Sequence, residues 1–339
     1  MSFGSLSSPV PEAQFDAYAA AREKMFARLD KYQSLNDDDD TVHFLRSVFR
    51  FLPTRGQARL ANDVEDCDDD SQLLQLAKHL DTTLLKPMLA TGGTTPAITP
   101  SPLPGVEDSI EDLPSLQVDS ATLRLSKTRR ICLQRDNYQC VVTKAWEHEH
   151  NPIVNLPPDA LTADLEAAHI IPFALGSFRE DERLRHGYIW QCLYRYFPTI
   201  RDLFHRGGED VNCIDNVMMM ASPLHREFGR FSFVLEETSV SGRYRVKIFS
   251  RFRTFYQSIM PDFTRIASHD PRYPAPHSSL LAVHAAVGNI LHATGHGELI
   301  AKTMQHLGGN GMHALANDGS TNVEELLSVT GLSLLVTGE

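Results

Sequence analysis

The sequence predicts an α+β protein, and three observations carry this prediction. The first third has apolar residues at helical spacing, the middle has short apolar runs beside turn residues, and the end has one long apolar stretch. The 339 residues are 42% hydrophobic and 22% charged, which is an ordinary globular composition. This composition excludes collagen-like, mucin-like and wholly disordered chains.

The first third is expected to be helical. Apolar residues recur at helical spacing over residues 15–32, 42–52 and 73–84. Two acidic runs, Asp37–Asp40 and Asp68–Asp70, separate these stripes. We interpret both runs as solvated loops or helix starts, because charge runs usually lie in solvent.

The chain is expected to divide into four parts. Residues 91–120 are rich in Thr, Pro, Gly and Ser and lack a periodic apolar stripe, which is typical of a flexible linker. The predicted division is a helical N-terminal domain at 1–90, this linker, a central domain at 121–256 and a C-terminal helical tail at 257–339.

The central domain is expected to alternate helices with short strands. The expected elements are a basic helix at 122–132, a strand at 140–143, an apolar run at 167–173 and a helical stretch at 193–204 that Pro198 interrupts.

The second half of this domain carries clearer signals. A strand is expected at 216–221, and Ser222-Pro223 indicates a helix start with Ser as the N-cap. Residues 231–235 and 244–249 alternate around Ser241-Gly242, which predicts a hairpin. The tail is expected to hold an apolar helix at 278–292.

Charge and targeting signals limit the class of protein. The net charge of −11, from 32 basic and 43 acidic residues, disfavours nucleic acid over the whole chain, but the middle third is slightly basic. No apolar run is long enough to span a membrane, and the N-terminus resembles no secretory signal. Five cysteines without a Cys-x-x-Cys pair fit a reducing compartment. We therefore expect an intracellular protein, in nucleus or cytoplasm, without a membrane partner.

Three pieces of the middle region form one constellation. His169 lies in the apolar segment Glu166–Phe173, Asn216 precedes a strand, and His225 lies in the first turn of a helix that begins at Ser222. The order is therefore a strand with His, a long insertion, Asn, a strand, and a helix with His.

This order resembles the HNH nuclease family, and more narrowly a variant common in fungal proteins whose first motif reads Ala-Ala-His-Ile-x-Pro-Phe. The resemblance covers roughly residues 129–250, and Arg135–Thr143 is similar to the opening of such domains. It implies a ββα-metal (HNH) core with an added β-hairpin and helices, preceded by a small helical domain.

The resemblance also implies residue roles. His169 matches the general base, Asn216 matches the residue that holds the connecting loop, and His225 matches a ligand of a divalent metal. Two positions depart from the family pattern: Ala168 and Gly229 stand where other members carry further ligands. Few protein ligands, or none that bind strongly, would then hold the metal.

The chemistry favours these residue types independently of the family. Hydrolysis of a phosphodiester needs a water made nucleophilic near pH 7, which suits a neutral imidazole. A divalent cation can stabilise the charge that develops on the phosphoryl oxygens. Mg²⁺ is expected because it keeps most of its waters and tolerates few protein ligands.

A basic face is expected to contact nucleic acid. DNA is the expected partner, with RNA as the alternative, and the contacts to phosphate would be salt-sensitive and tolerant of sequence. The alternative, given equal weight, is that these basic residues form an ordinary charged surface over the core and contact no nucleic acid. The candidate contacts in the predicted domain are Arg129, Arg130, Arg226 and Arg230.

Two function classes stay open. The first is a metal-dependent HNH-type endonuclease. The second is a catalytically weak or inactive module that uses the HNH scaffold to bind nucleic acid or protein, as the departures at Ala168 and Gly229 suggest. In either case, the helical N-terminal domain could carry a protein partner.

Overall fold

The computed structural model describes residues 12–91, 120–150, 156, 159–176, 183–204 and 211–298, and it mixes helices with short strands. The α+β prediction is confirmed. Within these residues, none of the helices combines the length and the apolar character needed to span a membrane.

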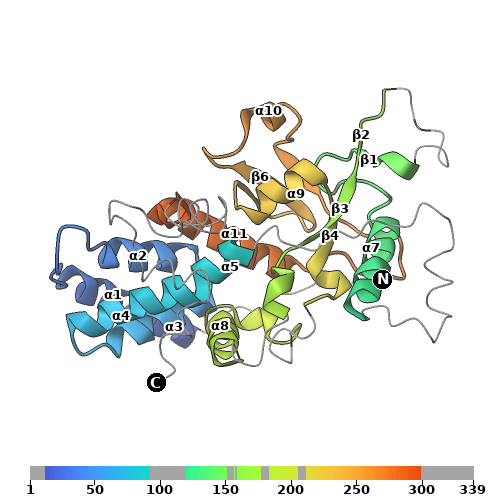
Figure 1. Ribbon diagram of the computed structural model, residues 1–339. Coiled ribbons are helices and arrows are strands. Elements are labelled where there is room, and N and C mark those ends of the chain that lie inside the picture. The colour runs from blue at the N-terminus through green and yellow to red at the C-terminus, as the bar shows by residue number, and fades with distance from the viewer. Residues whose placement is uncertain are drawn as a thin grey trace, which may run out of the picture.

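Helices form the first part of the described chain (Figure 1). They are α1 (Glu12–Asp30), α2 (Thr41–Phe51), α3 (Thr54–Glu65), α4 (Asp70–Leu80), the π-helical turn η1 (Asp81–Leu85) and α5 (Lys86–Thr91). The three predicted stripes correspond to α1, α2 and α4. The periodicity does not reveal α3, because that helix is mostly polar and buries few apolar side chains.

The acidic runs are loops and helix starts, as predicted. Asp39 accepts hydrogen bonds from the backbone N–H groups of Leu35 and Thr41 and so shapes the turn before α2. Asp69 is the N-cap of α4 and accepts from the N–H of Gln72 at 2.8 Å. Each carboxylate satisfies backbone donors that the turn or helix end leaves open.

The middle part carries three small sheets. Its elements are α7 (Ser120–Arg135), β1 (Trp146–Glu147), η2 (His148–His150), β2 (Thr162–Ala163), β3 (Leu165–His169), η3 (Phe173–Gly176), α8 (Arg183–Tyr196), η5 (Pro198–Ile200), η6 (Ile214–Asn216), β4 (Val217–Ala221), α9 (Ser222–Gly229), β5 (Phe233–Glu237), β6 (Arg243–Ile248), α10 (Thr254–Gln257) and β7 (Phe263–Arg265). The sheets pair β1 with β2, β3 with β4, and β5 with β6 and β7.

The prediction of a strand at 140–143 is wrong. These residues form a turn in which the N–H of Cys140 donates to the carbonyl of Ala145 and the N–H of Lys144 donates to the carbonyl of Cys140. The apolar run is buried, which explains the prediction, but only Val141 donates to a strand, at the carbonyl of Met219. A short apolar run can be buried without being a strand.

The predicted hairpin is confirmed as β5 and β6, which pair antiparallel. Gly242 begins the return with φ of 71°, a conformation that suits glycine. The third strand of this sheet, β7, is not predicted from the sequence.

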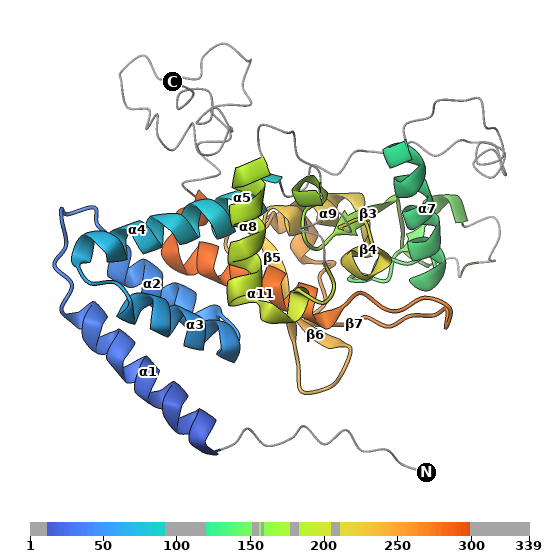
Figure 2. The same cartoon turned by 90° about the horizontal axis from the view of Figure 1, so that it is seen from below.

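The tail helix α11 (Ser278–Thr294) is a central element of the fold. It packs on α2 and on β5, and from below it lies between the N-terminal helices and the β5–β6 hairpin (Figure 2). Buried hydrophobic residues from Met25 to Leu291 form one cluster that includes all three parts. Almost all of the predicted linker at 91–120 lies outside the described residues, so the four-part division stays a prediction.

Candidate active site

A hairpin and a helix hold the predicted site residues. β3 and β4 pair antiparallel, with His169 opposite Val217 and Glu166 opposite Met220. α9 begins at the residue after β4, so His225 is carried back beside β3. All five residues of β4 are buried, because α7 and α9 both pack on this hairpin.

His225 and Glu166 are joined by a direct hydrogen bond. The Nδ1 atom of His225 lies 2.7 Å from Oε2 of Glu166, and the Ser222 hydroxyl donates to Oε1 of the same carboxylate at 2.7 Å. The hydrogen bond with His225 and that with Ser222 lower the pKa of Glu166, although partial burial opposes them. Glu166 is therefore an ionised carboxylate whose side chain is still 44% exposed.

Glu166, on β3, contacts His225 across the hairpin–helix unit. One sequence interpretation needs correction here. Ser222 was expected to be the N-cap of the helix, but Ala221 is the N-cap, and the Ser222 hydroxyl donates to Glu166 instead. The side chain prefers the carboxylate because a charge-assisted hydrogen bond is stronger than a neutral cap.

His169 occupies a different environment. Its side chain is buried, its Nε2 lies 3.2 Å from Oδ1 of Asn212, and its Nδ1 has no hydrogen-bond partner in the described structure. Burial, together with the charge of His225, lowers the pKa of His169 to about 4, while the contact with Asn212 opposes this shift. The imidazole is therefore neutral at pH 7 and has a lone pair on one nitrogen.

Asn216 ties together the chain on both sides of the insertion. Its Oδ1 accepts from the N–H of Ile171 at 2.8 Å, and its Nδ2 donates to the carbonyls of Ile171 and Val211, both at 2.9 Å. The backbone carbonyl of Asn216 also accepts from Ile170. These contacts fix the turn that directly follows His169.

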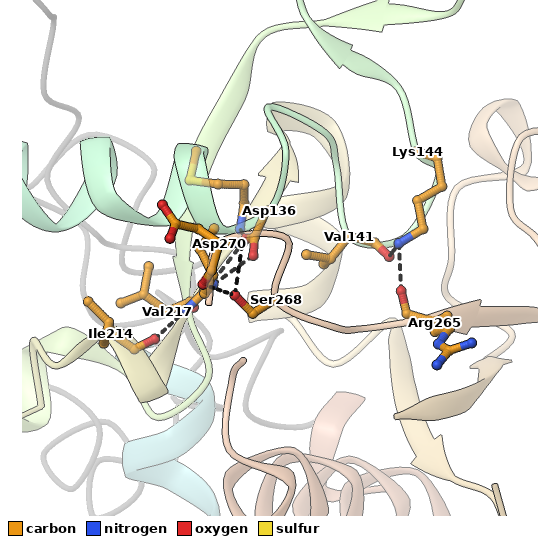
Figure 3. A network of polar contacts seen from close by, with 10 residues as sticks. Asp136, Val141, Lys144, Ile214, Val217, Arg265, Ser268 and Asp270 are labelled. Carbon is orange, nitrogen blue, oxygen red and sulfur yellow. Dashed lines mark hydrogen bonds and ion pairs between the residues drawn. The ribbon is translucent and has the colours of Figure 1, made fainter. Parts of the chain in front are cut away.

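A buried ion pair braces the start of β4. Arg135 and Asp136, at the end of α7, are bonded to each other, and the guanidinium donates to the carbonyls of Ile214 and Val217, each at 2.6 Å. Asp136 in turn accepts from the N–H of Met219. Figure 3 shows Ile214 and Val217 close to Asp136. The segment Arg135–Thr143, which resembles the opening of HNH domains, thus positions β4, the strand that leads to His225.

Further along, Figure 3 shows Lys144 between the turn at Val141 and the strand β7. Its ammonium donates to the carbonyls of Val141 and Arg265, at 3.0 and 2.6 Å. Burial lowers the pKa of Lys144. This lysine is a structural link that holds the third sheet against the turn at 140–145.

Two of the four candidate arginines lie free on α9 or at its end. Arg226 and Arg230 are exposed, and the charge of Arg226 contributes to the lowered pKa of Glu166, so this side chain lies near the candidate site.

The other two candidate arginines, on α7, are less available. The guanidinium of Arg129 donates to the carbonyl of Leu165 and lies 3.6 Å from Glu147, with only 19% of its side chain exposed. Arg130 is half-buried. Arg129 is thus a brace for the start of β3 rather than a free phosphate contact.

The residues present fit a hydrated divalent ion better than a closed protein cage. Glu166 supplies a carboxylate and His225 an imidazole beside it. The described part of the chain contains no cluster of three or more His, Cys, Asp or Glu side chains arranged to hold a metal. A hydrated ion such as Mg²⁺ tolerates so few protein ligands, whereas structural zinc requires about four.

The site is thus a strand hairpin and a helix that bring two histidines and an asparagine into one unit. The model of a family described as HNH endonuclease matches residues 140–236, which include β3, β4, α9 and all but the last residue of β5. The predicted resemblance to the HNH endonuclease family is confirmed for this segment. No curated protein and no solved structure matches the chain.

The family match supports nuclease-type function and nucleic acid as the partner. Sequence reasoning missed Glu166 as a partner of His225 and Asn212 as a partner of His169. The available signal for Glu166 was its position as a carboxylate three residues before His169. Asn212 lies in the insertion, where no pattern in a single sequence marks it.

Proposed function

We propose that the unit of β3, β4 and α9 is a ββα-metal site that hydrolyses phosphodiester bonds of DNA, with RNA as the alternative substrate. The observation that carries this proposal is the contrast between its two histidines. His225 is bonded to an ionised carboxylate, whereas His169 is neutral and has an unpartnered Nδ1.

His225 and Glu166 are the proposed metal-holding residues. The contact between them uses Nδ1 of His225, so Nε2 is the nitrogen that could face a cation. When bound, a divalent ion such as Mg²⁺ would stabilise negative charge on the phosphate. Glu166 either shares the ion or orients the imidazole, and both roles need its negative charge.

His169 is the proposed general base. With Nε2–H donating to Asn212, Nδ1 is the nitrogen that carries the lone pair and would take the proton, although the structure buries this atom away from solvent. The neutral form needed for this step is present above about pH 4. Asn216 is a positioning residue, because it fixes the turn that follows His169.

The decisive experiment is a plasmid-nicking assay with purified protein and Mg²⁺ or Mn²⁺. We expect H169A to lower the rate by about 10²–10⁴-fold, the usual contribution of a general base. His148, an exposed histidine, supplies the matched control H148A, which should cleave normally. Absence of divalent-dependent cleavage by the wild-type protein would favour the alternative of an inactive binding module.

The metal role has its own test. We expect E166Q to raise the Mn²⁺ concentration needed for half-maximal cleavage by about 10- to 100-fold, the usual effect of losing a partner of a metal-ligating histidine. S222A removes only a hydroxyl from the same carboxylate and should have a smaller effect. An unchanged metal requirement in E166Q would exclude Glu166 from the site.

A further inference from the structure

A second candidate binding site lies outside the hairpin–helix unit, in a cleft between α1, α3 and α8. This cleft has a volume of about 1410 Å³. Four of the described residues that line it are arginines and four are tyrosines, and none of them is Asp or Glu. The chain as a whole carries a net charge of −11, so an acid-free cleft of this kind is a local departure from its composition.

The two walls of the cleft come from helices far apart in the sequence. Arg55 and Arg59 are one helical turn apart on α3, and Tyr188 and Gln191 are neighbours on one face of α8. The helix α8 lies within the insertion between His169 and Asn216, and it packs on α3 and η1 (Figure 1). The insertion of the HNH domain therefore completes a site on the N-terminal helices.

The floor of the cleft is rigid. Two groups on α8 donate to the carboxylate of Asp63 on α3: Nε of Arg195 at 2.8 Å and the hydroxyl of Tyr196 at 2.6 Å. Gly56 lets the helices approach, because a Cβ at that position would overlap the carbonyl oxygen of Tyr196. The cleft is thus formed before any ligand binds.

The groups above this floor are available to a ligand. Arg55 and Arg59 are exposed and have no ion pair or hydrogen bond from their side chains among the described residues. Arg201 lies at the edge with its guanidinium 6.0 Å from the ring centre of Tyr194. Tyr188 is 55% exposed, so its ring is accessible to a ligand.

We propose that this cleft binds a single strand of nucleic acid. Unpaired guanidinium groups suit phosphates, and an exposed tyrosine ring suits the face of an unpaired base, which is how single strands are usually held. Free nucleotides share this chemistry, but the cleft is open and its arginines stand on two separate elements, which suits a chain of phosphates. The inference rests on the proposed function in one respect: the strand would be the substrate.

The test is fluorescence anisotropy with a labelled 20-nucleotide single-stranded DNA and the full chain, in EDTA so that no cleavage occurs. We expect R55Q/R59Q to weaken binding at least tenfold. The slope of log affinity against log salt should fall by about 1.4, since each lost phosphate contact on a single strand accounts for about 0.7. The control R243Q/R265Q removes the same charge from exposed arginines on β6 and β7 and should bind as the wild type does.

The ring has a separate test. Y188A should weaken binding by about 5- to 150-fold, the range for one stacked base. Y188F keeps the ring and should restore most of the affinity. Ultraviolet cross-linking followed by mass spectrometry should place the strand on the peptide that contains Tyr188.

The outcomes separate this inference from the proposed function. H169A should bind the strand normally, so loss of cleavage with intact binding affects only the nuclease proposal. The inference is overturned if the control double variant loses as much affinity as R55Q/R59Q. It is also overturned if ATP or an acidic peptide displaces the strand at equal concentration, or if a duplex binds more tightly and Y188A has no effect.

Discussion

At the scale of single residues, environment rather than residue type separates the two histidines of the site. Both are buried in the same hairpin–helix unit. The carboxylate of Glu166 is hydrogen-bonded to His225. The amide oxygen of Asn212 is hydrogen-bonded to His169, whose Nδ1 has no hydrogen-bond partner. Two chemically identical side chains can therefore take different tasks, because the groups around them fix which nitrogen is available.

Asn216 gives the clearest prediction at this scale. It is fully buried, and its amide makes two hydrogen bonds to Ile171 across the insertion and a third to Val211 within it. We expect N216A to lower the free energy of unfolding by about 2–4 kcal/mol, because the partners of those bonds would be left buried and unsatisfied. N216D should cost at least as much at pH 7, since a carboxylate would face two carbonyl oxygens. Urea unfolding of the three proteins measures the difference.

A loss below about 1 kcal/mol in N216A would mean that water replaces the amide, and the positioning role would fail with it. S222A is a useful comparison because its hydroxyl makes a bond at the edge of the same unit, where solvent can replace it.

At the scale of elements, the sequence predicts those whose signals are local. The stripes of α1, α2, α4 and α11 and the turn between β5 and β6 are fixed by periodicity and by Gly242, and they lie where predicted. Elements that depend on tertiary contacts are missed. β7 pairs only with its neighbour β6, and the run at 140–143 is buried as a turn because the chain reverses at Lys144.

The candidate site divides in the same way. The motif order identifies His169, Asn216 and His225, and the family match covers all three. The motif order does not identify the hydrogen-bond partners of these histidines. Glu166 contacts His225 only because the hairpin and α9 fold back together, and Asn212 lies in a loop of the insertion. Contacts between elements cannot be obtained from spacing along a single chain.

The contact between α3 and α8 provides a matched pair of predictions at this scale. G56A should destabilise the protein by about 1–3 kcal/mol, because the added methyl group would overlap the backbone of Tyr196. Gly187, on α8, has open space around it, so G187A should stabilise the protein by about 0.5–1 kcal/mol through helix propensity. Thermal unfolding of both variants gives the comparison, and equal effects would show that the close approach of the helices is unimportant.

At the scale of the whole molecule, one hydrophobic cluster runs from the N-terminal helices through the hairpin–helix unit to α11. Because α8 and α11 both pack on the N-terminal helices, unfolding of one part exposes apolar surface of the others. We expect a single cooperative transition by circular dichroism and by tryptophan fluorescence. Two separate transitions would support the predicted division at 91–120.

The stability of the whole molecule should also depend on pH at both ends of the range, because buried histidines are shifted in opposite directions. Burial lowers the pKa of His169 to about 4 and that of His284 to about 3. Unfolding returns each to about 6.5, so the unfolded chain binds more protons in this window. Stability therefore falls as the pH drops below about 6.5, by at most about 1.4 kcal/mol per pH unit for each imidazole.

His296 acts at the alkaline end. It lies 2.8 Å from Asp81 and 3.0 Å from Asp40, while Lys86 pairs with the other oxygen of Asp81 and the ring of Phe44 lies against the imidazole. Burial opposes the charged form, but the two carboxylates outweigh it and raise the pKa of His296 to about 9. The folded chain then binds the extra proton between about pH 6.5 and 9, so this contribution is complete below 6.5 and is lost as the pH rises through 9.

The substitution H296N isolates this alkaline contribution. The variant should be less stable than the wild type at pH 6 and should lose little further stability between pH 7 and 9, whereas the wild type declines over that range. The exposed His148 supplies the control H148N, which should keep the wild-type profile. Because His296 joins the end of α11 to the start of α2 and to η1, a wild-type profile that is flat up to pH 9 would mean that these elements are not held together by this charge cluster.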